Sequence, residues 1–164
     1  MAQYTATTSP FTLASAATDI LTITGSATKT VRVQYLALNA SQTTEGLNVW
    51  SLVRRSTANS GGTSTPLTII QKNSLEPVPT ATVLLYSANP TLGTLVGTIR
   101  KDTLSAPSLL SVLSDAIYDW LLIKFSGDEG AVLNGTSECL AINFNGAAIP
   151  AGLTCSFTIE WDES

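Results

Sequence analysis

The chain contains no histidine, and this absence excludes more functions than any residue present suggests. Ser-His-Asp and Cys-His nucleophile systems, histidine-ligated zinc sites and proton transfer by imidazole all need that side chain. Carboxylate, lysine or tyrosine chemistry is what remains, and the sequence carries no recognisable motif for it. We therefore expect a protein that is not an enzyme and that uses no cofactor.

Charged residues are also few, at 12% of the 164 residues. The formal net charge is −4. Proteins that bind duplex nucleic acid need clustered Lys and Arg to displace counterions, whereas the eight basic residues here are scattered. The longest lipophilic stretch, 106–125, is interrupted by Asp115, Asp119 and Lys124. We expect no nucleic-acid partner and no membrane span. The hydrophobic content of 44% excludes a disordered chain.

Cysteine is limited to Cys139 and Cys155, whose spacing fits no zinc or CxxC pattern. Strand alternation places Cys155 on an apolar face and turns Cys139 away from its apolar neighbours, so we expect no disulfide between them. Reduced thiols fit synthesis in a reducing cytoplasm. Asp128 and Glu129 stand in a glycine-bounded turn, but the DxDxDG series of calcium ligands is absent, so no metal site is expected.

What the sequence does contain is a series of β-branched and aromatic runs separated by Gly, Pro, Asn and Ser clusters, which is typical of an antiparallel all-β domain. The first two runs, 20–24 and 30–38, look like a hairpin across 25–29. Segment 66–75 fits either a short helix or an irregular edge segment, and segment 105–115 fits either a short helix or a loop that packs down on the domain. The set predicts a two-sheet antiparallel β-sandwich of jelly-roll or immunoglobulin-like type. Its further strands are expected at 47–55, 80–88, 92–101, 117–125, 139–144 and 153–161.

The first eighteen residues differ from the rest, because they are rich in Thr, Ser and Ala and have large apolar side chains only at Tyr4, Phe11 and Leu13. We expect 1–18 to form an extended N-terminal arm and 19–164 to form a single sandwich domain. An arm has unpaired backbone groups that can add to the sheet edge of a neighbour. A frayed terminus without a partner is the alternative.

A polar, glycine-rich loop at 57–66 is a further candidate for contact with a partner, through Asn59 and Gly61. Loops of this kind on a rigid sheet often carry contacts to another molecule, although a solvated connection is the simpler alternative.

The ends of two strands hold the only concentrated positive charge, at Arg54, Arg55 and Arg100. Rim salt bridges to an acidic neighbour would use these side chains, and solvated strand ends are the alternative. Trp50 shares a strand face with Arg54 and is the best candidate for an exposed aromatic contact. Trp161 lies on an apolar face and is expected in the core.

Four blocks of the chain, residues 20–33, 55–63, 86–93 and 149–161, resemble small virion structural proteins of tailed bacteriophages. The resemblance implies a β-sandwich that decorates and stabilises the assembled phage head as a cement protein, on the outer surface of the virion. Its implied partners are the major capsid protein and further copies of itself in a homotrimer. Segments 72–79 and 101–119 depart from these blocks. A fibre, neck or baseplate adhesin that contacts host glycan through Trp50 or the Asn59 loop is the alternative.

Overall fold

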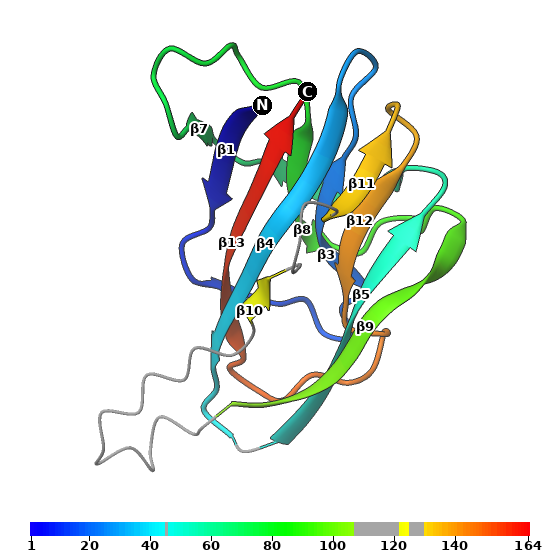
Figure 1. The fold of residues 1–164 in the computed structure, drawn as a ribbon. Helices are drawn as coiled ribbons and strands as arrows, with labels where there is room; N and C mark the ends of the chain where they lie inside the picture. The colour runs from blue at the N-terminus through cyan, green and yellow to red at the C-terminus, as the bar shows by residue number, and fades with distance from the viewer. Residues whose placement is uncertain (45, 107–121, 125–129) are drawn as a thin grey trace.

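The computed structural model describes residues 1–44, 46–106, 122–124 and 130–164, which form strands and connecting loops without a helix (Figure 1). The strands in chain order are β1 (Ala2–Thr7), β2 (Phe11–Thr12), β3 (Asp19–Thr24), β4 (Thr30–Ser41), β5 (Gly46–Arg55), β6 (Thr63–Pro66), β7 (Ile69–Gln71), β8 (Thr82–Ala88), β9 (Leu95–Ala106), β10 (Leu122–Lys124), β11 (Ala131–Asn134), β12 (Cys139–Asn143) and β13 (Thr154–Glu163).

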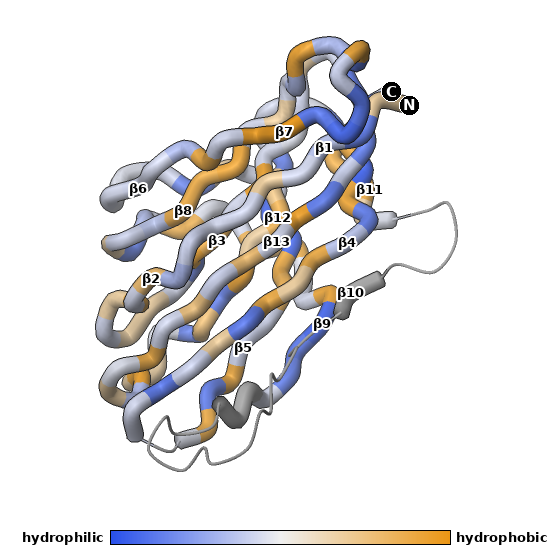
Figure 2. The backbone as a smooth tube through the Cα atoms, turned by 90° about the vertical axis from the view of Figure 1, so that its left-hand side faces the viewer, coloured by the Kyte–Doolittle hydropathy of each residue, from blue (hydrophilic) through white to orange (hydrophobic). Residues whose placement is uncertain are grey.

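These strands form two antiparallel sheets that pack face to face, so the predicted β-sandwich is confirmed (Figures 1 and 2). The first sheet has seven strands in the order β10-β4-β13-β1-β7, with β11 also paired to β4 and β2 to β13. The second has six strands in the order β6-β8-β3-β12-β5-β9. Among the described strands, β7 and β9 are therefore edge strands of different sheets, and they lie on opposite sides of the sandwich in both views.

The core between the sheets follows from alternation along each strand. In β13, the side chains of Cys155, Phe157, Ile159 and Trp161 are buried in it, and the residues between them are less buried. β12 is different, because all five of its residues are buried. Leu140 and Ile142 belong to the central core. Side chains alternate across a strand, so the residues between them face the other side of the sheet, where loops must cover them.

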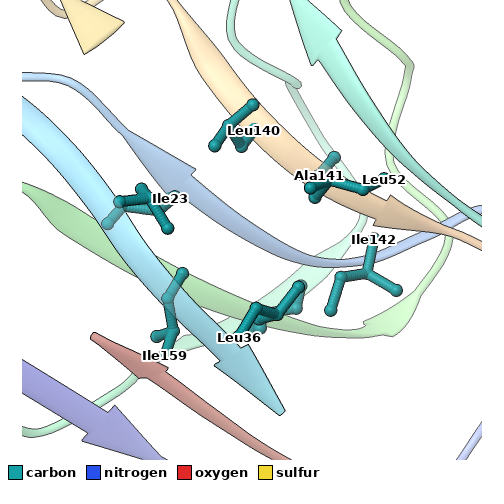
Figure 3. Close-up of a pocket in the computed structure, with 9 residues that line it drawn as sticks. Ile23, Leu36, Leu52, Leu140, Ala141, Ile142 and Ile159 are labelled. Atoms are coloured by element: carbon teal, nitrogen blue, oxygen red, sulfur yellow. The ribbon is translucent and has the colours of Figure 1, made fainter. Parts of the chain in front are cut away.

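One small cavity interrupts this core (Figure 3). Its volume of about 10 Å³ is at the lower limit for a single water molecule, and its walls offer no polar side chain to hold one. It is a packing defect rather than a ligand site. Its lining consists of Leu21, Ile23, Val33, Leu36, Leu52, Leu140, Ala141, Ile142 and Ile159.

The N-terminal segment is extended, as predicted, but it lies within the sandwich of its own chain. β1 pairs with β13 on one side and with β7 on the other, with Tyr4 opposite Trp161 and Gln71. Its alternate residues Ala2, Tyr4 and Ala6 are buried in the core. The sandwich therefore begins at Ala2 and not at residue 19, because this strand satisfies the backbone of β13 and covers part of the apolar face.

The expected hairpin between 20–24 and 30–38 is wrong. β3 pairs with β12 and β8 in the six-stranded sheet, whereas β4 pairs with β13, β10 and β11 in the other sheet. The loop 25–29 crosses between the sheets. Both strands bury one apolar face, and packing these faces against each other removes more apolar surface from water than pairing the strands side by side.

The strands expected at 47–55, 80–88, 92–101, 139–144 and 153–161 agree with β5, β8, β9, β12 and β13 to within about five residues at each end. Segment 66–75 contains the end of β6 and the short edge strand β7, so the alternative of an irregular edge segment is confirmed and the short helix is wrong. The expected strand at 117–125 and the segment 105–115 lie largely outside the described residues, as do Asp115, Asp119, Trp120, Asp128 and Glu129. Across the described part of the chain, no helix has the length and apolarity to span a membrane.

Candidate functional site

A buried polar cluster under two surface loops is the most highly organised polar feature of the described structure. At its centre is Asp19, the first residue of β3, whose side chain is 0% exposed. Both of its carboxylate oxygens accept hydrogen bonds from Arg55, with Nε at 2.7 Å and Nη2 at 2.9 Å. The side-chain amides of Asn59 and Asn143 donate to the same carboxylate at 2.7 and 2.6 Å. We call these four residues the Asp19 network.

The Asp19 network holds the loops through Gly93. The Arg55 Nη1 group donates to the Gly93 carbonyl at 2.8 Å, and the Gly93 N–H donates to Oδ1 of Asn59 at 2.8 Å. Both backbone groups of this residue are thus bonded to network side chains. A buried carboxylate with four donors and a buried guanidinium with three acceptor contacts leave little unpaired charge, as burial requires.

Backbone bonds then join residues 56–62 to residues 89–94, and we call these two segments together the loop platform. Ser60 and Thr91 exchange two hydrogen bonds, at 3.0 and 2.8 Å. Ser56 donates to the Thr94 carbonyl at 2.9 Å, and the Thr94 N–H donates to the Thr57 hydroxyl at 2.7 Å. The side chain of Asn89 also bonds the backbone of the 16–18 segment. The platform is therefore fixed to the sheet at several points.

Glycine is required at specific places in the platform. A Cβ on Gly93 would collide with the carbonyl oxygen of Thr57, so the two loops approach each other only because that side chain is missing. Gly61 and Gly62 have φ of +63° and +69°, in the left-handed region that favours glycine. The glycine-rich composition of this segment builds a defined shape rather than a flexible connection.

The outward surface of the platform is polar and without charge. Its exposed positions carry hydroxyl, amide and backbone groups together with Ala58 and Leu92, from Ser56–Ala58, Ser60–Gly62, Asn89, Thr91, Leu92 and Thr94. Such a surface can donate and accept hydrogen bonds and offers no nucleophile activated by a base and no titratable group. Its chemistry suits hydrogen bonding to another polar surface.

The positively charged candidates are already paired within the chain. Arg55 is buried in the Asp19 network, so its expected role at the rim is wrong. Arg54 lies 2.8 Å from Glu138, and Arg100 lies 3.2 Å from Asp102. The Asn134 N–H and then Arg54 hold the pKa of Glu138 below its usual value.

Three apolar candidates are buried in the core and present no surface to a partner in this conformation. Tyr4 is 0% exposed, stacks on Trp161 with a centroid distance of 5.8 Å, and donates its hydroxyl to the Pro77 carbonyl. Leu13 belongs to the same core. Trp50 is 2% exposed, so its prediction as an exposed aromatic is wrong, because its strand face is the core face.

The other candidates lie nearer the surface. Phe11 is partly exposed and packs on Phe157 with a centroid distance of 5.7 Å. Asn59 and Gly61 both lie in the loop platform, as does the backbone that Arg55 holds. The structure thus brings together three of the predicted contact residues, of which Arg55 is buried, Asn59 is partly buried and Gly61 is exposed.

A second buried acid, Glu163, ties the C-terminal strand to the segment before β8. Its carboxylate accepts hydrogen bonds from the backbone of Thr80 and Ala81, the Thr80 hydroxyl and the Trp161 indole, at 2.6 to 3.1 Å. Burial acts to raise the pKa of this carboxyl, but these hydrogen bonds outweigh burial and the pKa lies below its usual value. The group is therefore an ionised structural anchor.

The two thiols are buried and unbonded to each other, as predicted. Burial raises the pKa of Cys139 to about 11 and that of Cys155 to about 12, so both are protonated at neutral pH and are poor nucleophiles. Within residues 1–44, 46–106, 122–124 and 130–164, no three His, Cys, Asp or Glu side chains gather as a metal site requires.

Sequence reasoning missed Asp19 and Asn143 as parts of the site. The available signal was a charged residue at the start of an apolar strand, since an acid beside Ile20 and Leu21 must find a cation when buried. The partner is 36 residues away, on a strand that is not adjacent to β3, so local pattern cannot identify it.

Comparison with protein-family models, with curated proteins and with solved structures finds no match to this chain.

Proposed function

We propose that this chain is a structural protein of a tailed-phage virion that binds the outer surface of the assembled head and stabilises it, without enzymatic activity. The observation that carries the proposal is the loop platform, a polar surface held in one shape by the Asp19 network. Preorganised loops lose little conformational freedom on binding, so their hydrogen bonds contribute more fully to affinity.

The position of the platform in the sequence adds support. Two of the four blocks that resemble phage virion proteins, 55–63 and 86–93, contain most of its residues together with Arg55 and Asn59. The resemblance and the buried network therefore point to the same surface. A protein that binds only the assembled shell stabilises it by its binding free energy, and many copies add their contributions.

A glycan-binding adhesin has less support from the same residues. Trp50, the aromatic residue that would stack on a sugar, is buried in the core. Both polar atoms of the Asn59 side chain are bonded inside the platform. The platform keeps hydroxyl groups for hydrogen bonding, but none of its residues is aromatic.

The test is co-sedimentation of the purified chain with assembled head shells and with unassembled capsid subunits of the parent phage. We expect the chain to bind assembled shells and not unassembled subunits. Ser60→Glu and Thr91→Glu should lose this binding, because both side chains are exposed and the substitutions leave the backbone hydrogen bonds between the two residues in place. Thr68→Glu, an exposed threonine outside the platform, is the matched control and should bind normally.

Virions without the protein separate the two functions. Under the proposal they lose resistance to heat and osmotic shock and still adsorb to host cells. Normal resistance with lost adsorption, together with binding of the isolated chain to a glycan array, would show the adhesin instead.

A further inference from the structure

The loop that follows β7 carries the most exposed apolar side chains of the described structure. Leu75 is 91% exposed and Val78 is 78% exposed, and Ile70 in the preceding strand β7 is 56% exposed. The loop rises above the end of the sandwich where the two chain termini lie (Figure 1). We call these three residues the knob. Single apolar residues on a surface are ordinary, but several strongly exposed apolar residues in and next to one projecting loop indicate a contact.

The backbone under the knob is held in place. Nε2 of Gln71 donates to the carbonyls of Glu76 and Pro77 at 2.6 and 3.1 Å, and the Tyr4 hydroxyl donates to the Pro77 carbonyl at 2.9 Å. The base of the loop is held by an ion pair of 2.6 Å between Lys72 and Glu160. Several interactions therefore fix the conformation of a loop whose leucine and valine side chains are exposed to water.

A second apolar surface lies on the opposite side of the sandwich, on the edge strand β9. Leu95, Val96 and Ile99 are 54, 61 and 44% exposed, and we call them the β9 edge. Val96 and Ile99 fall where the register of β9 against β5 shifts, so each is a bulged residue without a partner of its own. Among the described strands, β9 has β5 as its single neighbour.

The charges beside the two surfaces are complementary. Glu76 lies between the two apolar tips of the knob, and Lys101 lies two residues beyond Ile99. Neither forms an ion pair with any residue that the structure describes, whereas Lys72, Arg54 and Arg100 all have acidic partners within the chain. One surface therefore offers apolar groups with an unpaired negative charge, and the other offers apolar groups with an unpaired positive charge.

We infer that the knob of one chain binds the β9 edge of a second copy of the same chain, with Glu76 facing Lys101. The contact joins two different surfaces, so it is heterologous, and each chain keeps one free knob and one free edge until a ring closes. Knob and edge lie on opposite sides of the sandwich, which is the placement that a head-to-tail contact needs (Figures 1 and 2). The inference deepens the proposed function, on which it rests for the size of the ring, because the resemblance to phage virion proteins implies a homotrimer.

The first measurement is the mass of the purified full chain by light scattering over a range of concentrations. We expect assemblies larger than the 17.2 kDa monomer, and a return to that mass in two double variants. One removes the knob by Leu75→Ser with Val78→Ser, and the other removes the edge by Val96→Ser with Ile99→Ser. Leu47→Ser, a leucine that is 71% exposed outside both surfaces, is the matched control and should leave the assembly unchanged.

Mixing the two double variants is the decisive step. Each keeps one intact surface, so a heterologous contact predicts that the mixture forms one-to-one dimers and nothing larger. Wild-type protein that stays monomeric at high concentration, or variants that fail to restore dimers while circular dichroism shows both folded, would overturn the inference. Monomeric protein that still binds head shells would leave the proposed function standing, and assembled protein that binds no shell would do the reverse.

Discussion

Arg55 and Asp19 form a bidentate ion pair across the strand β12, which lies between their own strands in the sheet. β3 carries the carboxylate and β5 the guanidinium, and β12 lies between these strands in the sheet. Nε and Nη2 of Arg55 reach one carboxylate oxygen each, at 2.7 and 2.9 Å. Asn143 of the intervening strand donates to the same carboxylate. The pair thus links three strands through side chains, and Arg55 extends the link to the loop platform through the Gly93 carbonyl.

Removing this carboxylate should be costly. Asp19→Ala leaves the Arg55 guanidinium buried and unpaired, which costs about 3–5 kcal/mol of unfolding free energy. Urea denaturation followed by tryptophan fluorescence measures the change. Asp102→Ala is the control, because Asp102 pairs with Arg100 on the exposed strand β9 and such pairs contribute about 0–1 kcal/mol. Equal losses in the two variants would contradict the structural role of the network.

Two glycines on either side of the β9 start allow a matched test of the platform. Gly93→Ala should destabilise the protein by about 1–3 kcal/mol, because its Cβ meets the backbone of Thr57 and the loops must separate. Gly97→Ala should change little, since nothing lies within 4 Å of a Cβ at that position. Thermal unfolding compares the two, and proteolysis between residues 56 and 62 should increase in Gly93→Ala only.

Glu163 should make stability depend on acidity. Its folded pKa lies below the ordinary value of 4.5, so its contribution is complete well above pH 4.5 and is lost as the pH falls through the folded value. Unfolding free energy should therefore decrease on acidification, with a shallower slope in Glu163→Gln. A slope remains in that variant, because the pKa values of Glu138 and Asp102 are also lowered. Identical slopes in the two proteins would refute the anchor role.

Both cysteines should resist alkylation in the folded protein. Burial raises their pKa values to about 11 and about 12, so at pH 8 the reactive thiolate is scarce and the sulfurs are covered. Iodoacetamide followed by mass spectrometry should show both thiols modified in urea and neither modified in native buffer over the same time. Rapid modification of either native thiol would mean that its cover opens.

Binding to head shells, if the proposed function holds, should depend weakly on salt. Arg54 and Arg100 are paired within the chain and Arg55 is buried, so the platform approaches its partner without free charge. Co-sedimentation at about 0.1 M and about 1 M salt, where the screening length falls from about 10 to about 3 Å, should give similar bound fractions. A collapse of binding at the higher concentration would indicate that charged residues carry the contact.

Self-association through the knob and the β9 edge should show more salt dependence than shell binding does. In the contact that we infer, Glu76 faces Lys101, and added salt screens the attraction between these two charges. The single variants Glu76→Lys and Lys101→Glu should each weaken assembly. The two changes in one chain should restore it, because the opposite charges then face each other again.

Local pattern along the sequence determined the strands and the state of the thiols. The run 153–161 alternates apolar and polar residues, and β13 buries the apolar set as expected. Cys155 faces the core between the sheets, whereas Cys139 is buried outside this core, and the two thiols are not bonded to each other. These properties depend on neighbours within a few residues, and such neighbours are visible in the sequence.

Tertiary structure alone decided which strands are adjacent and what covers each face. The alternation of residues in β5 indicates that the strand has one apolar face. It does not show that Trp50 is buried in the core, or that Arg55 forms a buried ion pair with Asp19. Tyr4 is buried because β1 fits between β13 and β7, which lie far from it in sequence. The physical reason is that a strand specifies the chemistry of its two faces, whereas the surface area removed from water depends on every other segment that packs there.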